Sequence, residues 1–303
     1  MSEAREKRVA LNVNLEKPQA RERGEDLLDW LRNRCRVTGH NLAQPLSPKT
    51  LAEADFVIVL GGDGTILSTV REMADHQVPV IGVNIGKLGF LAEFSLGQLH
   101  ENFERVLTDA ALVSRRIMLD CEVAGPGRAE PVALRAVNEL AVTAGPPFRM
   151  IEVSIRIGEE HLAVCLGDGL VVATPTGSTA YNLSAGGPIL AAGLEAAVLT
   201  PLAAHSLSFR PIVVDLSRSI RLQSPELHGH RHGLGEQCWG AAVAAVDGQQ
   251  TVALSGEDTV TITRARTCWQ LVHHPQQSQW RVLNRKLNWG VLPNYGDQKS
   301  RTT

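Results

Sequence analysis

The sequence is short of cysteine, of aromatic residues and of long apolar runs, and these shortages exclude several classes of protein. Five of the 303 residues are cysteines, and they form no C-x-x-C pair. This count and spacing exclude a disulfide framework and a cysteine zinc site. The chain contains no run of about 18 apolar residues, the length that a transmembrane helix needs. The charged N-terminus lacks an apolar signal core, so we expect a cytoplasmic protein without a membrane partner.

The charge balance excludes a further class. The chain contains 30 Lys and Arg residues and 32 Asp and Glu residues, which gives a formal net charge of −2. Proteins that coat nucleic acid are basic, so no nucleic-acid partner is expected. Hydrophobic residues make up 44% and charged residues 20%, which is ordinary for a globular protein of one or two domains.

The stretch VIVLGGDGT, Val57 to Thr65, is the most informative in the chain. Its four apolar residues predict a buried strand, and the apolar spacing after Thr65 predicts a helix. Asp63 therefore stands at the carboxyl end of a strand, which is the edge where open parallel sheets bind ligands. Gly64 lets a ligand approach the backbone closely. Asp63 is the first candidate for a catalytic residue.

Other interpretations of the glycine-rich stretches are weaker. GGDGT lacks the third glycine of a dinucleotide fingerprint, and a carboxylate at the turn would repel a pyrophosphate. An aspartate that caps a helix remains the plain alternative for Asp63. Gly82–Gly89, GVNIGKLG, has too few residues between its glycines for a Walker A motif. This loop is either a plain turn or a phosphate site with Lys87 as a point charge.

From Arg115 to about Trp280 the pattern changes to short β-type runs. Residues 151–157 alternate apolar and polar side chains, as a half-buried strand does, and Gly158-Glu159 and Asp247-Gly248 are turn signals of hairpins. We therefore predict a Rossmann-like, doubly wound α/β domain followed by an all-β sandwich. The expected segments are the α/β domain at 1–114, the sandwich at 115–290 and a disordered tail at 291–303.

The predicted β region carries the candidate ligand groups. Gly167–Pro188, GDGLVVATPTGSTAYNLSAGGP, combines small residues, hydroxyls and Tyr181, which offers a ring face to a heterocycle. A Ser/Thr-rich surface loop is the plain alternative. Asn138 and Glu139 interrupt an apolar strand, and a carboxylate there suits a vicinal ribose diol. The alternating histidines at 228–232 are better explained as a solvated loop than as a metal site.

Together these stretches resemble the bacterial-type NAD kinases, the ATP-NAD kinase family. The resemblance covers about Val9 to Gly290, and the stretch at 167–189 is more diagnostic than GGDGT, which lipid kinases share. Its other carriers are the segments 84–91, 138–139, 200–213 and 246–249.

The resemblance implies phosphorylation of the 2′-hydroxyl of the adenosine ribose of NAD, which gives NADP. Asp63 would be the general base. ATP or another phosphoryl donor would act with a divalent metal, Mg²⁺, for which no protein ligand is assigned. The enzyme would be a homodimer or homotetramer, with the site in the cleft between domains or across a subunit contact. The implied substrate-binding residues are Asp63, Gly64, Asn138, Glu139, Arg149, Asp168, Thr179, Ala180, Tyr181, Asn182, Leu183, Ser184, Ala203 and Gln249.

The sequence also departs from the family, and two rival functions stay open. Ala204 stands where a proline is usual, Ser68 where some relatives have a basic residue, and segment 225–240 matches nothing recognisable. These departures leave the reaction intact and leave open the phosphoryl donor and the loop contacts. The sequence does not settle the preference between NAD and NADH. A lipid kinase would need a cavity for acyl chains, and a non-catalytic NAD sensor would bind NAD without forming NADP.

Overall fold

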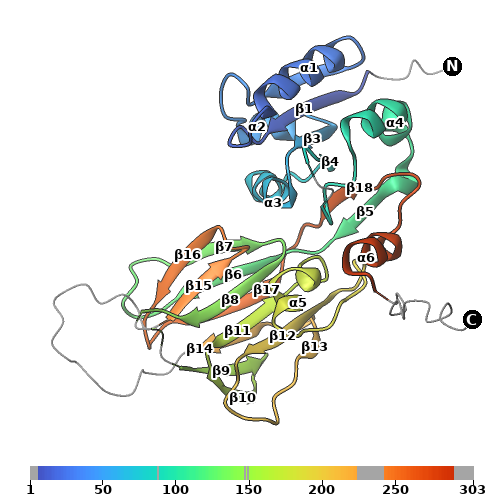
Figure 1. Cartoon of the computed structure of the whole chain (residues 1–303). Coiled ribbons are helices and arrows are strands. Elements are labelled where there is room, and N and C mark those ends of the chain that lie inside the picture. The colour runs from blue at the N-terminus through green and yellow to red at the C-terminus, as the bar shows by residue number, and fades with distance from the viewer. Residues whose placement is uncertain (1–5, 87–88, 147, 149, 224–241, 290–303) are drawn as a thin grey trace, which may run out of the picture.

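The computed structural model consists of an α/β part stacked on a β-sandwich (Figure 1). It describes residues 6–86, 89–146, 148, 150–223 and 242–289. Within this part of the chain no helix is long and apolar enough to span a membrane. Four cysteines in the same ranges, Cys35, Cys121, Cys165 and Cys268, are free thiols, as the spacing predicted.

The α/β part is built on a six-stranded sheet with the order β2-β1-β3-β4-β18-β5. All its strands are parallel except β5, which pairs antiparallel with β18 at one edge. The strands are β1 (Arg8–Val13), β2 (Arg36–His40), β3 (Phe56–Leu60), β4 (Pro79–Val83), β5 (Val113–Arg116) and β18 (Trp269–Val272).

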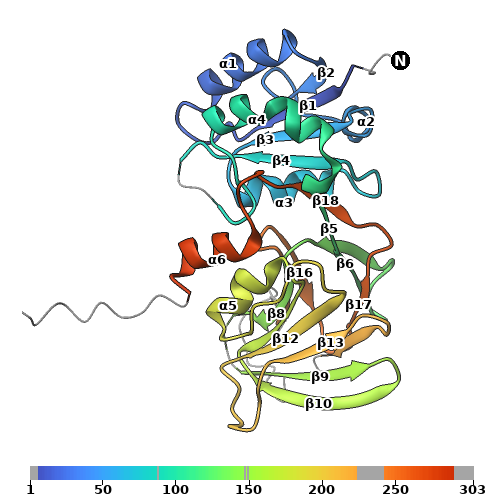
Figure 2. The ribbon, with the colours of Figure 1, turned by 90° about the vertical axis from the view of Figure 1, so that its right-hand side faces the viewer.

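Helices cover both faces of this sheet, as the predicted doubly wound fold requires (Figure 2). Helices α1 (Ala20–Arg32) and α4 (Leu96–Thr108) pack on one face, and α4 leads into a 3₁₀ turn at Ala110–Leu112. Helices α2 (Pro48–Ala52) and α3 (Asp63–Glu72) pack on the other. The side chains of β3 point alternately to the two faces, which explains why every residue of this strand is apolar and buried.

The β part is a sandwich of two six-stranded antiparallel sheets, and this confirms the predicted fold class. One sheet has the order β10-β9-β14-β17-β6-β7, and the other β13-β12-β11-β8-β15-β16. The strands of the first sheet are β6 (Leu119–Ala124), β7 (Val132–Ala136), β9 (Ile151–Ile157), β10 (Glu160–Gly167), β14 (Ile220–Gln223) and β17 (Thr259–Arg264). Those of the second are β8 (Glu139–Ala144), β11 (Gly169–Ala173), β12 (Ala196–Leu202), β13 (Ile212–Asp215), β15 (Ala242–Val246) and β16 (Gln250–Leu254).

The inward side chains of the two sheets form one core. Ile151, Val153 and Ile155 of β9 pack in the same cluster as Leu170 and Val172 of β11, as the alternation predicted. The predicted hairpin turns are confirmed, because Gly158, Asp247 and Gly248 all have positive φ between paired strands. Three short helices complete the chain, namely a 3₁₀ turn at Gly177–Thr179, α5 (Tyr181–Ser184) and α6 (Gln279–Leu287).

The end of the chain returns from the sandwich to the first sheet. Strand β18 inserts between β4 and β5, and α6 then lies at the junction of the two parts (Figure 1). Strand pairing therefore crosses the expected division at residue 114, because β18 lies within the segment 115–290. The sequence pattern of a strand does not reveal which sheet the strand joins. The domain boundaries stay a prediction, and the expected tail at 291–303 lies outside the described residues.

The return strand generates a stability prediction. Trp269 of β18 has 0% of its surface exposed and packs in the core of the α/β part. We expect Trp269→Ala to lower the free energy of unfolding by about 3–5 kcal/mol, because it leaves a large cavity. Chemical denaturation measures this loss. Trp280→Ala, at a position that is 63% exposed, is the control and is expected to cost little. Equal stability of the two variants would contradict a core role for β18.

Candidate active site

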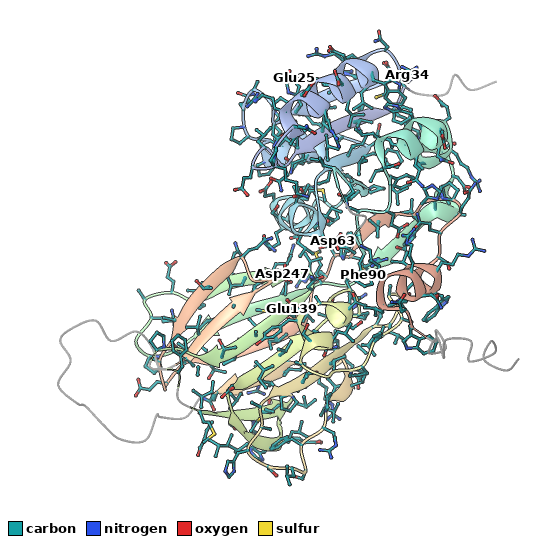
Figure 3. The ribbon with its side chains drawn as sticks, viewed as in Figure 1. Glu25, Arg34, Asp63, Phe90, Glu139 and Asp247 are labelled. Carbon is teal, nitrogen blue, oxygen red and sulfur yellow. The ribbon has the colours of Figure 1, made fainter. Side chains whose placement is uncertain are left out.

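Asp63 lies at the carboxyl end of β3, where the two parts of the molecule meet (Figure 3). Its carboxylate accepts hydrogen bonds from three consecutive backbone N–H groups of the segment after β4. Oδ2 accepts from Phe90 at 2.9 Å, and Oδ1 accepts from Leu91 at 3.0 Å and Ala92 at 3.1 Å. The cap residue of α3 is Gly62, which has no side chain, so the alternative of Asp63 as a helix cap is wrong.

A glycine makes this arrangement possible. A Cβ atom at Gly89 would lie 2.0 Å from Oδ1 of Asp63, far inside van der Waals contact. The second glycine of GKLG therefore provides space for the carboxylate and has no need of a phosphate ligand to explain it. Lys87, the point charge that the sequence suggested, lies outside the described residues.

A cavity of about 710 Å³ opens beside Asp63 at the same sheet edge. It is lined by the end of β1 and the loop that follows, by Gly62, Gly64 and the first turns of α3, and by Gln249 of the sandwich. The ammonium of Lys17 lies 3.4 Å from the position of a Cβ at Gly62. The first N–H groups of a helix lack intrahelical acceptors, so this cavity combines a cation with a helix N-terminus. Both features suit phosphate groups.

Asp247 holds the segment that carries Asn138 and Glu139. Its buried carboxylate accepts N–H groups from Val137 at 3.1 Å, Asn138 at 2.8 Å and Glu139 at 3.1 Å. Arg71 of α3 forms an ion pair with the same carboxylate. The site thus contains two carboxylates, Asp63 and Asp247, that each bind three consecutive amides.

Gln249 provides a second link between the parts. Its Nε2 donates to the carbonyl of Gly64 at 3.1 Å, and its Oε1 accepts from Arg71. Sequence reasoning named Gln249 but missed Arg71, Asp247 and Lys17 as site residues. Arg71 lies two helical turns after Asp63 on the same helix, and this spacing was the one available signal.

Glu139 begins β8 and is 7% exposed. Burial raises the pKa of its carboxyl to about 7, the negative charge of Asp247 adds to the shift, and the backbone N–H of Tyr181 opposes it. Among the described residues its Oε2 is buried without a hydrogen-bond partner. A buried acceptor without a donor is costly, so this oxygen is suited to a ligand hydroxyl. Figure 3 shows Glu139, Asp247, Phe90 and Asp63 gathered at the junction.

The loop after β11 packs tightly on the same segment. Thr174 donates its hydroxyl to the carbonyl of Val137 at 2.7 Å, and a Cβ at Gly177 would lie 2.1 Å from the carbonyl oxygen of Asn138. Asn182 has no exposed surface. Its amide donates to the carbonyls of Ser178 and Pro188, at 2.9 and 3.0 Å, and accepts from Thr200 at 2.6 Å. Its side chain therefore holds the loop together and is not available to a ligand in this conformation.

The remaining predicted residues fall into three groups. Thr179, Ala180 and Tyr181 lie in the loop beside Glu139, where Tyr181 is 43% exposed. Leu183 and the exposed Ser184 follow in α5, one turn further on. Asp168 and Ala203 are exposed at the opposite end of β11, about 17 Å from Glu139 along the strand direction. Arg149 and the segment 225–240 lie outside the described residues.

The described residues contain no group of three or more His, Cys, Asp or Glu side chains that could hold a metal ion. The cavity beside Asp63 is lined by two carboxylates, Glu16 and Glu72, that do not form such a cluster. Mg²⁺ commonly uses one or two carboxylates together with substrate phosphates, so these residues fit a cation that arrives with a phosphate donor.

Comparisons with known proteins point to one family over most of the chain. Residues 36–111 match the family model of the ATP-NAD kinase N-terminal domain, and residues 137–274 match that of the C-terminal domain. The NAD kinase of Heliobacterium modesticaldum is 36% identical over 291 residues, which cover 93% of this chain and 99% of that protein. The NAD kinase of Syntrophotalea carbinolica is 35% identical over 294 residues, 94% of this chain and 99% of that protein.

Two solved structures share the fold. An NAD kinase from Archaeoglobus fulgidus in complex with ATP has a TM-score of 0.70 and 26% identity, and the match covers 93% of this chain and 98% of that one. Yeast NADH kinase complexed with NADH has a TM-score of 0.82 at 24% identity, over 94% of this chain and 89% of that one.

The buried Glu139 predicts a pH dependence of stability. Its pKa rises from 4.5 to about 7 on folding, so its contribution is fully present below about pH 4.5 and is lost as the pH rises through 7. We expect Glu139→Gln to remove this loss. Denaturation from pH 4 to 8 measures the free energy of unfolding of both proteins. The value for the variant minus that for the wild type should rise between pH 4.5 and about 7 and then level off, with a total rise of about 3 kcal/mol at most. A difference that is independent of pH would contradict the buried, protonated carboxyl.

Proposed function

The chain belongs to the ATP-NAD kinase family, and on that premise we propose that it transfers the terminal phosphoryl group of ATP to the 2′-hydroxyl of the adenosine ribose of NAD. The product is NADP. The observation that carries the proposal is the Asp63 carboxylate, held by three amides at the edge of the sheet. Its neighbours Gly62 and Gly64 line the 710 Å³ cavity, and Glu139 lies at the same junction (Figure 3). The proposal is of a cytoplasmic enzyme.

Asp63 is proposed as the general base. A carboxylate offers about four acceptor positions, and the three amides use two on Oδ1 and one on Oδ2. The remaining position, on Oδ2, is available to the nucleophilic hydroxyl. In the reaction the 2′-oxygen forms a bond to the terminal phosphorus, the bond from that phosphorus to the leaving ADP oxygen breaks, and the hydroxyl proton passes to Asp63.

Glu139 and Asn138 are proposed to bind the ribose. The Oε2 atom of Glu139, which lacks a described partner, would accept a ribose hydroxyl. The side chain of Asn138 lies on the same segment, whose backbone Asp247 fixes. Thr179, Ala180 and Tyr181 are proposed to line the site beside Glu139, to which the backbone N–H of Tyr181 donates. Asn182 is proposed to act indirectly, because its amide holds the loop.

The 710 Å³ cavity is proposed as the donor site. The ammonium of Lys17 and the N-terminus of α3 would bind the phosphates, and Glu16 or Glu72 would contribute to holding a divalent cation together with them. When bound, the cation neutralises charge on the donor phosphates. ATP fits this proposal, and a polyphosphate donor would use the same cation and helix end.

Asp168 and Ala203 have a separate place in the proposal. They lie about 17 Å from Glu139 along the strand direction, so they contact the same dinucleotide only at its far end or from a second copy of the chain. A homodimer or homotetramer is therefore part of the proposal. Gln249 is proposed to fix the backbone of Gly64 beside the nucleophile.

The central test is Asp63→Asn, which removes the proton acceptor and keeps the size of the side chain. We expect kcat for NADP formation to fall by about 10²- to 10⁴-fold. A coupled assay of NADP measures it.

Binding must be measured as well as turnover. In the Asp63→Asn variant the side-chain NH2 group would face the backbone N–H of Phe90, so that two hydrogen-bond donors meet without an acceptor. Calorimetry should find NAD affinity close to that of the wild type. Near wild-type kcat in this variant would overturn the role of Asp63. Binding of NAD by the wild type without NADP formation from any phosphoryl donor would favour a sensor, and phosphorylation of diacylglycerol instead would favour a lipid kinase.

The donor site has its own test in Lys17→Met. A charged hydrogen bond to phosphate contributes about 1.5–3 kcal/mol, so we expect KM for ATP to rise by about 10- to 100-fold. KM for NAD should change little. Lys49→Met is the matched control, because Lys49 lies on the same domain and its side chain is 86% exposed. An equal rise in both KM values would argue against a donor site at Lys17.

A further inference from the structure

We propose that Glu93 is a positioning residue for this reaction, because it fixes the backbone segment whose N–H groups orient Asp63. The inference rests on the proposed function. Glu93 lies immediately after Phe90, Leu91 and Ala92, whose amides bind the Asp63 carboxylate. It is 3% exposed, and no step of the proposed reaction uses it.

The side chain of Glu93 binds the part of the chain between β18 and α6. Its Oε1 lies 2.8 Å from Nδ1 of His273, and its Oε2 accepts the backbone N–H of His274 at 3.0 Å. Its carbonyl also accepts from Nε2 of Gln277 at 3.3 Å. These three bonds attach the end of the chain to the segment that holds the candidate base.

The hydrogen-bond contacts continue to β5. Nδ1 of His273 lies 2.8 Å from Oε1 of Glu93, and its Nε2 lies 2.7 Å from the hydroxyl oxygen of Ser114. Nε of Arg116 donates to that hydroxyl at 3.4 Å. Burial lowers the pKa of Arg116 to about 10, and the charge of Glu93 opposes this shift. A continuous series of hydrogen-bond contacts thus joins Glu93 through His273 and Ser114 to Arg116.

Ser114, His273 and Glu93 follow the hydrogen-bond order of a serine hydrolase triad, but the cavity at Glu93 is too small for a substrate. The cavity lined by Glu93 and Arg116 has a volume of about 30 Å³. This holds one or two water molecules, whereas ligand pockets measure about 300–1,000 Å³. The chain of hydrogen bonds therefore acts on the position of Glu93.

Movement of the segment would pass directly to Asp63. The segment returns to the sheet through Phe94, which donates to Gly82 at 3.0 Å, so Glu93 lies between two fixed points. Phe90 and Leu91 line the same 30 Å³ cavity as Thr176 and Thr179, which leaves little room for alternative positions. A displacement of about 1 Å at a reacting group costs on the order of 10²-fold in rate. Loss of Glu93 should therefore affect turnover more than binding.

The test is a double-mutant cycle on the full-length enzyme. Glu93→Ala is expected to lower kcat by about 10- to 100-fold while KM for NAD stays within about threefold. In the Asp63→Asn background the same substitution should lower kcat by less than a further factor of about two, because Glu93 acts through Asp63. A merely structural role would not produce this loss of additivity.

The control is Arg135→Met. Arg135 of β7 joins the two parts elsewhere, through Asp75 at 2.8 Å and Asp120 at 2.7 Å. Its loss should lower thermal stability and leave kcat unchanged. Glu93→Gln keeps the side-chain volume and replaces Glu93→Ala in the same cycle if the alanine variant does not fold.

The outcomes separate this inference from the proposed function. A loss of kcat in Asp63→Asn together with wild-type kcat in both Glu93 variants overturns the positioning role and leaves the proposed function intact. Additive losses in the double variant also overturn it, because Glu93 would then act independently of Asp63. Wild-type kcat in Asp63→Asn overturns both.

Discussion

The ion pair between Arg71 and Asp247 is the interaction on which the arrangement of the site depends. Asp247 has no side-chain exposure, and its carboxylate binds three amides of the segment 137–139 as well as Arg71. Arg71 lies on the helix that Asp63 begins. The pair therefore sets the distance between the candidate base and the candidate ribose site. Removing one partner of such a buried pair costs about 3–5 kcal/mol, because the other charge is left uncompensated.

The path of the chain supplies the second constraint. The two parts touch through α3 on one side and through α6 on the other, where Gln279 binds the backbone of Leu190 and Ala192. Glu93 binds His273 and His274 in the segment that joins β18 to α6. A chain that ended in the sandwich would leave the segment at 90–92 attached only to its own sheet. The return of β18 between β4 and β5 makes the orientation of Asp63 depend on both ends of the protein.

Local sequence patterns predicted those features of the fold and of the site that depend on residues close together in the chain. The apolar run of β3, the glycines around Asp63, the alternation in β9 and the two hairpin turns were all readable, because strand periodicity and turn geometry are local. Arg71 and Lys17 were missed because each acts on a partner far along the chain, and Arg71 reaches Asp247 over 176 residues. Asn182 stays a predicted site residue, and its side-chain hydrogen bonds to the carbonyls of Ser178 and Pro188 are a contact that its sequence pattern does not reveal.

The unpaired oxygen of Glu139 connects stability to specificity. Among the described residues this oxygen is buried without a donor, an arrangement that costs about 1–3 kcal/mol. On the proposed function, a ribose hydroxyl supplies the missing donor and recovers that energy, while a deoxyribose analogue does not. Sites built to hydrogen-bond a hydroxyl reject analogues that lack it by about 10⁴- to 10⁵-fold, far more than an apolar pocket achieves. Burial of the ionised Glu139 carboxylate lowers the stability of the free protein as the pH rises through 7, and the same buried carboxylate selects a nucleotide that carries a ribose hydroxyl. Asp247 contributes to both effects, because its charge raises the pKa of Glu139 and its carboxylate fixes the backbone that aims it.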